Sequence, residues 1–119
     1  MSDSFKTDSW ILSMFEHWFD PCPFNPEFDN QKDIDGLEIS WGLKTFVNPP
    51  YSNPLPWVIK AIEENQAGRT VVMLLKHDSS TKWFRLLHEA GAKFLMVQGR
   101  LKHQTGKSCP FASILAVLE

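Results

Sequence analysis

Hydrophobic residues form three short runs in the middle and later part of the chain, and each run predicts a β-strand. Thr70–Leu75 is apolar almost without interruption, which is typical of a strand that is covered on both faces in a parallel sheet. Lys44–Val47 and Lys93–Val97 are shorter and contain β-branched or aromatic residues, a composition that also favours strands. These three runs are the predicted frame of the fold.

Apolar residues at helical spacing lie between these runs. One predicted helix begins at Pro54 or Pro56, where proline is well tolerated, and stops at Gly68. A second is capped by Ser79 or Ser80 and stops at the glycine of position 91. Strands that alternate with helices over so few residues indicate an α/β fold with right-handed crossovers and a mostly parallel sheet.

The two ends of the chain show different patterns. Asp8–Trp18 predicts a helix with a wide apolar stripe, of which Met14 and Phe15 are expected to lie in the core. Arg100–Lys102 and Ala112–Leu118 are two extended pieces joined by a loop without a helix. They predict a C-terminal antiparallel hairpin at an edge of the sheet.

The tetrad Asn48-Pro49-Pro50-Tyr51 directly follows the first predicted strand. Its two prolines each fix φ at about −65° and supply no N–H, so the segment is a rigid, extended exit from the strand. Asn48 Oδ1 and the Pro49 carbonyl can accept two N–H bonds, and the Tyr51 ring offers a stacking surface. A planar ligand with an amino group suits this arrangement. A proline-stiffened turn in which Tyr51 only packs for stability is the structural alternative.

In the order of the chain, the tetrad and the segments around it resemble the phage-type DNA N-6-adenine methyltransferase (Dam) family, from about residue 10 to the end. The segments that carry the resemblance are Trp10, Asp20-Pro21-Cys22, Asp35-Gly36-Leu37, Trp41, the tetrad with Ser52, Trp57, Thr81-Lys82-Trp83-Phe84, Gly99-Arg100-Leu101-Lys102 and Pro110-Phe111-Ala112-Ser113. The resemblance implies a compact, reduced Rossmann-like methyltransferase fold, and it makes the four residues of the tetrad the catalytic motif.

The same resemblance implies S-adenosylmethionine as the cofactor. Asp35 is expected at a strand end, where its carboxylate would accept hydrogen bonds from the cofactor's adenine amine or ribose, with Leu37 or Trp41 against the adenine face. Asp20 is the competing carboxylate and would face the cationic methionine amine. The chain has no Gly-x-Gly turn, and the loop after Asp20 is stiffened by proline instead. The residues expected to line the cofactor site are Trp10, Asp20, Pro21, Cys22, Asp35 and Leu37.

The chemistry of an exocyclic amine fits the tetrad. The lone pair of adenine N6 is delocalised into the ring, and two acceptors on its N–H bonds would direct that lone pair toward the cofactor's methyl group. In duplex DNA the adenine would be flipped out and stacked on Tyr51. Transfer to cytosine N4 uses the same two acceptors, so only the resemblance favours adenine. An inactive or regulatory binding module is a competing hypothesis, as is a small methyltransferase that acts on RNA or on protein amines.

Composition narrows the choice of compartment and partners. The 119 residues suit a single domain, and the N-terminal residues lack the pattern of a signal peptide. No apolar run is long enough to span a bilayer, so a cytoplasmic protein is expected, in a bacterial host if a phage encodes it. Cys22 and Cys109 show neither a disulfide framework nor zinc-like spacing with histidine, and no metal is expected.

Charge is distributed unevenly along the chain although the net charge is only −2. Acidic residues dominate positions 27–38, whereas basic residues gather in the second half. The expected DNA-facing residues lie at a strand end or a helix start near the tetrad, and the loop from Gln104 to Pro110 could also approach DNA. The residues expected to face DNA are Lys76, His77, Lys82 and Arg100. A homodimer is possible because so small a domain could need a second copy to grip a duplex.

Overall fold

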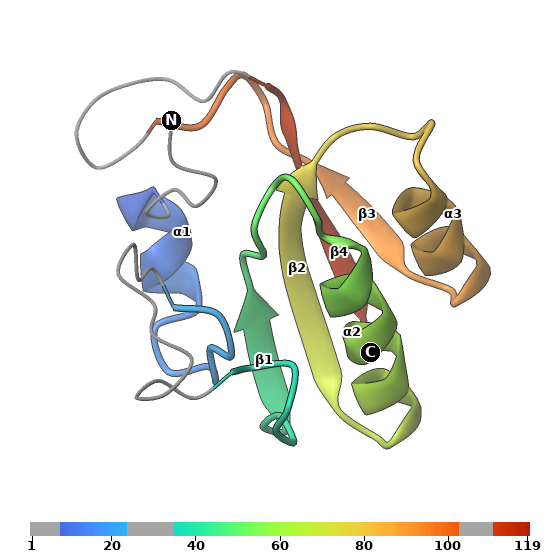
Figure 1. Cartoon of the computed structure of the whole chain (residues 1–119). Coiled ribbons are helices and arrows are strands. Elements are labelled where there is room, and N and C mark those ends of the chain that lie inside the picture. The colour runs from blue at the N-terminus through green and yellow to red at the C-terminus, as the bar shows by residue number, and fades with distance from the viewer. Residues whose placement is uncertain (1–7, 24–34, 103–110) are drawn as a thin grey trace.

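The computed structural model describes residues 8–23, 35–102 and 111–119, and these ranges form a compact α/β fold around one four-stranded sheet (Figure 1). The strand order is β1-β2-β4-β3. β1 and β2 are parallel, while β4 runs antiparallel to both of its neighbours. The strands are β1 (Lys44–Val47), β2 (Thr70–Lys76), β3 (Lys93–Met96) and β4 (Ser113–Leu118).

The three strands predicted from the apolar runs are confirmed, but two predictions about the sheet are wrong. The sheet is mixed and not mostly parallel, because β4 lies between β2 and β3 and opposes both. Ala112–Leu118 also forms no edge hairpin with Arg100–Lys102. Leu115, near the middle of β4, instead pairs with Leu74 of β2 on one side and with Leu95 of β3 on the other. β3 is therefore the edge strand.

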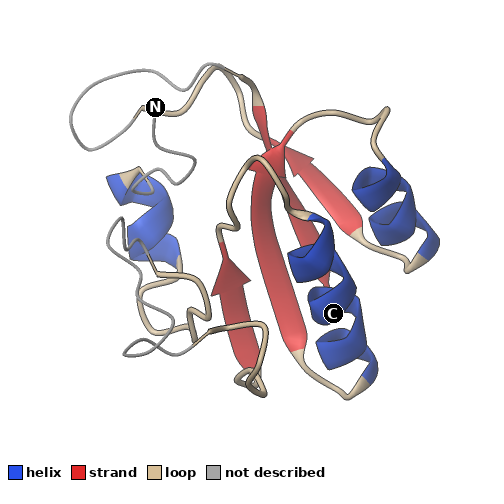
Figure 2. Ribbon diagram, in the orientation of Figure 1, coloured by secondary structure: helices blue, strands red, loops and turns tan. Residues whose placement is uncertain are grey.

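Two helices cover one face of the sheet, as Figure 2 shows. α2 (Leu55–Gln66) begins after Pro54 and ends just before Gly68, whose φ of 100° suits glycine, so this predicted helix is confirmed. α3 (Lys82–Glu89) is capped by Thr81, whose hydroxyl oxygen accepts the N–H of Phe84 at 3.3 Å. The predicted cap at Ser79 or Ser80 was wrong.

α1 (Ser9–Met14) lies at the other face and is shorter than the predicted helix Asp8–Trp18. Ile11 is fully buried, and Phe15, just past the helix, stacks on Phe46 of β1 with ring centroids 4.6 Å apart. Met14 is 56% exposed, so the prediction that it lies in the core was wrong. None of the helices in the described ranges is long and apolar enough to cross a membrane.

Candidate active site

Three segments leave the sheet at its carboxyl edge, the side on which the parallel strands β1 and β2 end. Because β1 and β2 are parallel, the residues that follow Val47 and Lys76 emerge side by side (Figure 1). Directly before Asp20, Phe19 pairs in parallel with Thr45 of β1 in a single bridge. Asp20 therefore also leaves at this edge, and the carboxyl ends of these segments bring together the candidate active site.

The tetrad is held at this edge by the buried end of β1. Val47 and Pro49 are buried, Asn48 is half-buried, and the ring of Tyr51 meets Phe111 edge to face, with centroids 4.6 Å apart. The side-chain oxygen of Asn48 lies in the interior and accepts no hydrogen bond within the described ranges. Other atoms of the tetrad residues do have partners. The tetrad thus directly follows β1, and its rigid, extended form stays a prediction.

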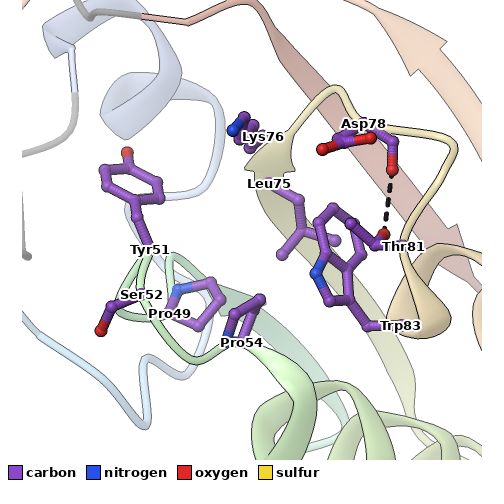
Figure 3. A pocket seen from close by; sticks show the side chains of 9 residues that line it. All are labelled: Pro49, Tyr51, Ser52, Pro54, Leu75, Lys76, Asp78, Thr81 and Trp83. Carbon is purple, nitrogen blue, oxygen red and sulfur yellow. Dashed lines mark hydrogen bonds between the residues drawn. The ribbon is translucent and has the colours of Figure 1, made fainter.

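A small cavity opens beside the tetrad, with a volume of about 140 Å³ (Figure 3). Tyr51 forms one side, the start of α3 forms the opposite side, and Leu75 from the end of β2 lies between them. Pockets that enclose a drug-sized ligand have volumes of about 300–1,000 Å³, so this cavity can hold one planar ring system and little more. Its lining residues are Pro49, Tyr51, Ser52, Pro54, Leu75, Lys76, Asp78, Thr81 and Trp83.

The far side of the cavity is a braced loop between β2 and α3. The Asp78 carboxylate accepts hydrogen bonds from the backbone N–H of Ser80 at 3.1 Å and from its hydroxyl, and the Thr81 hydroxyl donates to the Asp78 carbonyl at 2.9 Å. The hydrogen bonds from Ser80, helped by the charge of Lys76, lower the pKa of Asp78. The rim of the cavity therefore carries the Asp78 carboxylate of the loop and the Lys76 ammonium group at the end of β2.

Asp20 and Asp35, the two carboxylates that were predicted to bind the cofactor, both lie in turns. Asp20 Oδ1 accepts the N–H of Cys22, and Asp35 Oδ1 accepts the N–H of Leu37, both at 2.9 Å. Asp35 precedes a turn, so the prediction that it sits at a strand end was wrong. Residue 20 remains exposed as a whole, yet enough protein surrounds its carboxyl to raise the pKa of Asp20.

The two turns are docked against each other. A Cβ at Gly36 would lie 1.9 Å from the backbone oxygen of Pro21, so only glycine allows this approach. Between the turns, the half-buried Cys22 thiol is held neutral, because partial burial and the charges of Asp20 and Asp35 raise its pKa to about 12. The Cys22 thiol thus lies near both carboxylates.

A buried polar network supports the second of these turns. The indole N–H of Trp41 donates to the Gly36 carbonyl at 2.8 Å, and the backbone N–H of Trp41 donates to Glu64 on α2 at 3.3 Å. Glu64 is only 6% exposed and pairs with both Lys60 and Arg69 at 3.0 Å. Trp41 is buried and stacks on Trp57. Its ring is therefore part of the core, not a surface for a cofactor.

The other residues that were predicted for the site lie partly at the cavity and partly outside it. Lys76 lines the cavity, while His77, Lys82 and Arg100 are exposed after β2, at the start of α3 and after β3, respectively. Trp10 is 47% exposed on α1, and its part in closing a cofactor site stays a prediction. The loop from Gln104 to Pro110, which includes Cys109, lies outside the described residues.

Sequence reasoning missed most of the far side of the cavity. Trp83 is buried, and it also lines the cavity together with Asp78 and Thr81. A signal was available, because residues that follow a strand parallel to β1 must emerge next to the tetrad. Only the basic residues of this segment were predicted to face the site, and its acidic and aromatic residues were overlooked.

Comparison with known proteins yields one family and two phage relatives. The family model described as DNA N-6-adenine-methyltransferase (Dam) matches residues 3–110. A DNA N-6-adenine-methyltransferase of Haemophilus phage HP1 is 38% identical over 94 residues, which cover 69% of this chain and 54% of the relative. One of Escherichia phage T1 is 38% identical over 72 residues, covering 59% of this chain and 30% of the relative. No solved structure matches.

Proposed function

The chain belongs to the DNA N-6-adenine-methyltransferase (Dam) family, and from this premise we propose that it transfers a methyl group to the N6 amine of an adenine in DNA. The observation that carries the proposal is the position of the tetrad, since Pro49 and Tyr51 line a cavity of the size of one base at the carboxyl edge of the sheet. The chain spans about half or less of the length of the curated relatives it matches.

The arrangement around β1 and β2 supports a reduced, Rossmann-like methyltransferase fold as part of this proposal. The unit β1-α2-β2 has two adjacent parallel strands joined by a helix that packs on the sheet. Its loops meet at the carboxyl edge, which is where open α/β sheets bind their ligands. β4 and β3 extend the sheet beyond β2, on the side away from β1.

The tetrad supplies the chemistry in this proposal. Asn48 Oδ1 and the Pro49 carbonyl accept the two N–H bonds of the target amine, and the ring of Tyr51 stacks on the flipped base. Two accepted hydrogen bonds localise the nitrogen lone pair, which would form the new N–C bond as the S–C bond of the methyl donor breaks and a neutral thioether leaves. The alkylated nitrogen then releases one proton. Pro50 keeps the tetrad extended while this occurs.

The carboxylate turns, and not the cavity, are the proposed place of the cofactor. A volume of about 140 Å³ cannot hold a base and S-adenosylmethionine together. The convergence of Asp20 and Asp35 around Cys22 fits a ligand that carries an ammonium group, a sulfonium and ribose hydroxyls. When bound, this cofactor supplies the methyl group. Asp20 and Asp35 would hold it, with Pro21, Cys22 and Leu37 beside them.

DNA would approach the exposed basic residues of the same edge. Lys76 stands at the rim of the cavity, and Lys82 starts the helix on its far side. His77 is exposed directly after Lys76, and Arg100 is exposed after β3, whose carboxyl end lies on the same side of the sheet as that of β2. Contacts from such residues to phosphate groups fix the position of a duplex without reading its sequence.

The direct test is incubation of the purified chain with methyl-labelled S-adenosylmethionine and unmethylated DNA, followed by nucleoside analysis, with calorimetric titration of the cofactor in parallel. N6-methyladenine is the expected product. N4-methylcytosine would instead assign the chain to cytosine as its target. Cofactor binding without any product would contradict the proposed activity, and Asp35→Ala should weaken the calorimetric signal if the carboxylate site is correct.

A further inference from the structure

The indole N–H of Trp83 is a donor that faces the cavity. The Trp83 side chain as a whole is buried, at 8% exposure, and it follows Lys82 in the first turn of α3. Figure 3 shows its ring nitrogen on the side of the indole that faces Pro49 and Pro54, across the cavity. No hydrogen bond of this N–H is found within the described ranges, and the nitrogen is not among the fully buried polar atoms that lack a partner, so it is open to the cavity. Once a base fills the cavity and excludes water, the N–H needs an acceptor, because a donor buried without one is unfavourable.

We propose that Trp83 is a specificity-determining residue whose N–H donates a hydrogen bond to a ring nitrogen of the target adenine. The inference rests on the proposed function, because it takes adenine as the occupant of the cavity. Adenine has a ring acceptor on each side of its amine, N1 on one side and N7 on the other. With the amine held at Asn48 and Pro49, one of these acceptors can face Trp83 across the same small cavity.

The other polar groups of the cavity match adenine less well. The Asp78 carboxylate is ionised and can only accept hydrogen bonds, whereas the ring nitrogens of adenine are themselves acceptors. Lys76 is an exposed ammonium group at the rim, which suits a phosphate better than a buried base edge. Among the cavity residues, Trp83 therefore combines burial with a donor aimed at the place of the base.

Such a donor would separate adenine from other bases. On the N1 side, guanine has an N–H that would oppose the N–H of Trp83, although its N7 is an acceptor as in adenine. Cytosine has an acceptor on one side of its N4 amine and a C–H on the other, so a donor on the N7 side would also disfavour cytosine. A site that hydrogen-bonds its substrate rejects analogues that lack the partner, because the buried group is then left unsatisfied.

Adenine analogues in DNA test this directly. Three oligonucleotides would carry adenine, 1-deazaadenine or 7-deazaadenine at the methylated position, and kcat/KM would be measured for the wild-type chain and for Trp83→Phe. Phenylalanine keeps an aromatic side chain and removes only the donor and part of the ring. Trp57→Phe is the matched control, because Trp57 is similarly buried but does not line the cavity.

We expect one deaza analogue to lower kcat/KM of the wild-type chain by about tenfold to a hundredfold. The same analogue should cost Trp83→Phe about twofold at most, and Trp57→Phe should keep the wild-type discrimination. Comparing variants on one analogue removes the effect of the deaza substitution on the reactivity of the amine itself.

Two results would overturn the inference while leaving the proposed function intact. One is equal sensitivity of the wild-type chain and Trp83→Phe to both analogues. The other is a wild-type chain that methylates all three oligonucleotides equally well, and this result needs no folded variant. If the wild-type chain methylates none of them, including unmodified adenine, then the proposed function itself fails and takes the inference with it.

Discussion

Replacing Gly36 with alanine should separate the two carboxylate turns. The added Cβ would lie 1.9 Å from the Pro21 oxygen and 2.8 Å from its carbonyl carbon. Ordinary contacts begin near 3.4 Å, so the first distance must grow by about 1.5 Å. Both atoms belong to the backbone, and no side chain can rotate away to relieve the clash. Overpacking of this kind costs about 1–3 kcal/mol of stability.

The same displacement should weaken cofactor binding, because Asp20 and Asp35 would no longer face one place. Losing one hydrogen bond to a charged group costs about 1.5–3 kcal/mol, which lowers affinity by about tenfold to a hundredfold. Gly68→Ala is the matched control. Gly68 has φ of 100° and no atom within 4 Å of an added Cβ, so alanine there is strained without touching the site.

Urea unfolding would measure stability for both variants, and calorimetry would measure their affinity for S-adenosylmethionine. Both should be destabilised, and only Gly36→Ala should lose affinity. If Gly36→Ala bound the cofactor as tightly as the wild-type chain, the docking of the two turns would not define the cofactor site. If both variants lost affinity equally, the effect would reflect stability alone.

Three other predictions test separate parts of the molecule. Asn48→Ala should abolish methyl transfer but leave calorimetric cofactor binding nearly unchanged, and methylation at the wild-type rate would remove Asn48 from the catalytic group. Glu64→Ala should lower the urea-unfolding free energy by about 1–3 kcal/mol, because it leaves the buried backbone N–H of Trp41 and the half-buried cations Lys60 and Arg69 without their acceptor, and a loss below about 0.5 kcal/mol would contradict this. In a Cys109→Ser background, alkylation of Cys22 by iodoacetamide should stay slow at pH 9, the usual thiol pKa, and accelerate only toward pH 12. Fast alkylation at pH 9 would refute the neutral thiol. Because the folded-state pKa is raised, the stability that Cys22 contributes is present below pH 9 and is lost as the pH rises toward 12.

The sequence predicted helices and strands correctly where a single local feature was strong. β2 and α2 were predicted correctly because an apolar run and a proline–glycine pair act over a few neighbouring residues. α1 ends early because Phe15 turns away to stack on Phe46, a contact between residues far apart in the sequence. No periodicity in Asp8–Trp18 contains that information.

The position of β4 was open to prediction, but the wrong signal was used. Ile114–Leu118 is continuously apolar, as Thr70–Leu75 is, and such runs are typical of strands covered on both faces. An edge hairpin would have alternated apolar and polar residues. The prediction of a hairpin gave more weight to the loop before this segment than to its own composition.

The candidate site was predictable in part. The tetrad follows β1 as expected, because proline chemistry acts locally. The cavity beside it depends on which strand lies next to β1, and this depends on the order of strands and not on any short motif. Trp83 illustrates the limit, since an apolar pattern looks the same for a core residue and for a residue that also faces a ligand.

The central position of β4 has a consequence for synthesis of the protein. β2 and β3 lie 16 residues apart in the sequence, between Lys76 and Lys93, yet they cannot join one sheet until Ser113–Leu118 has been made and inserted between them. While the ribosome is still adding those residues, the facing edges of β2 and β3 have no partner in this sheet, and exposed strand edges invite aggregation. Chaperones that shield such edges should therefore raise the yield of folded protein.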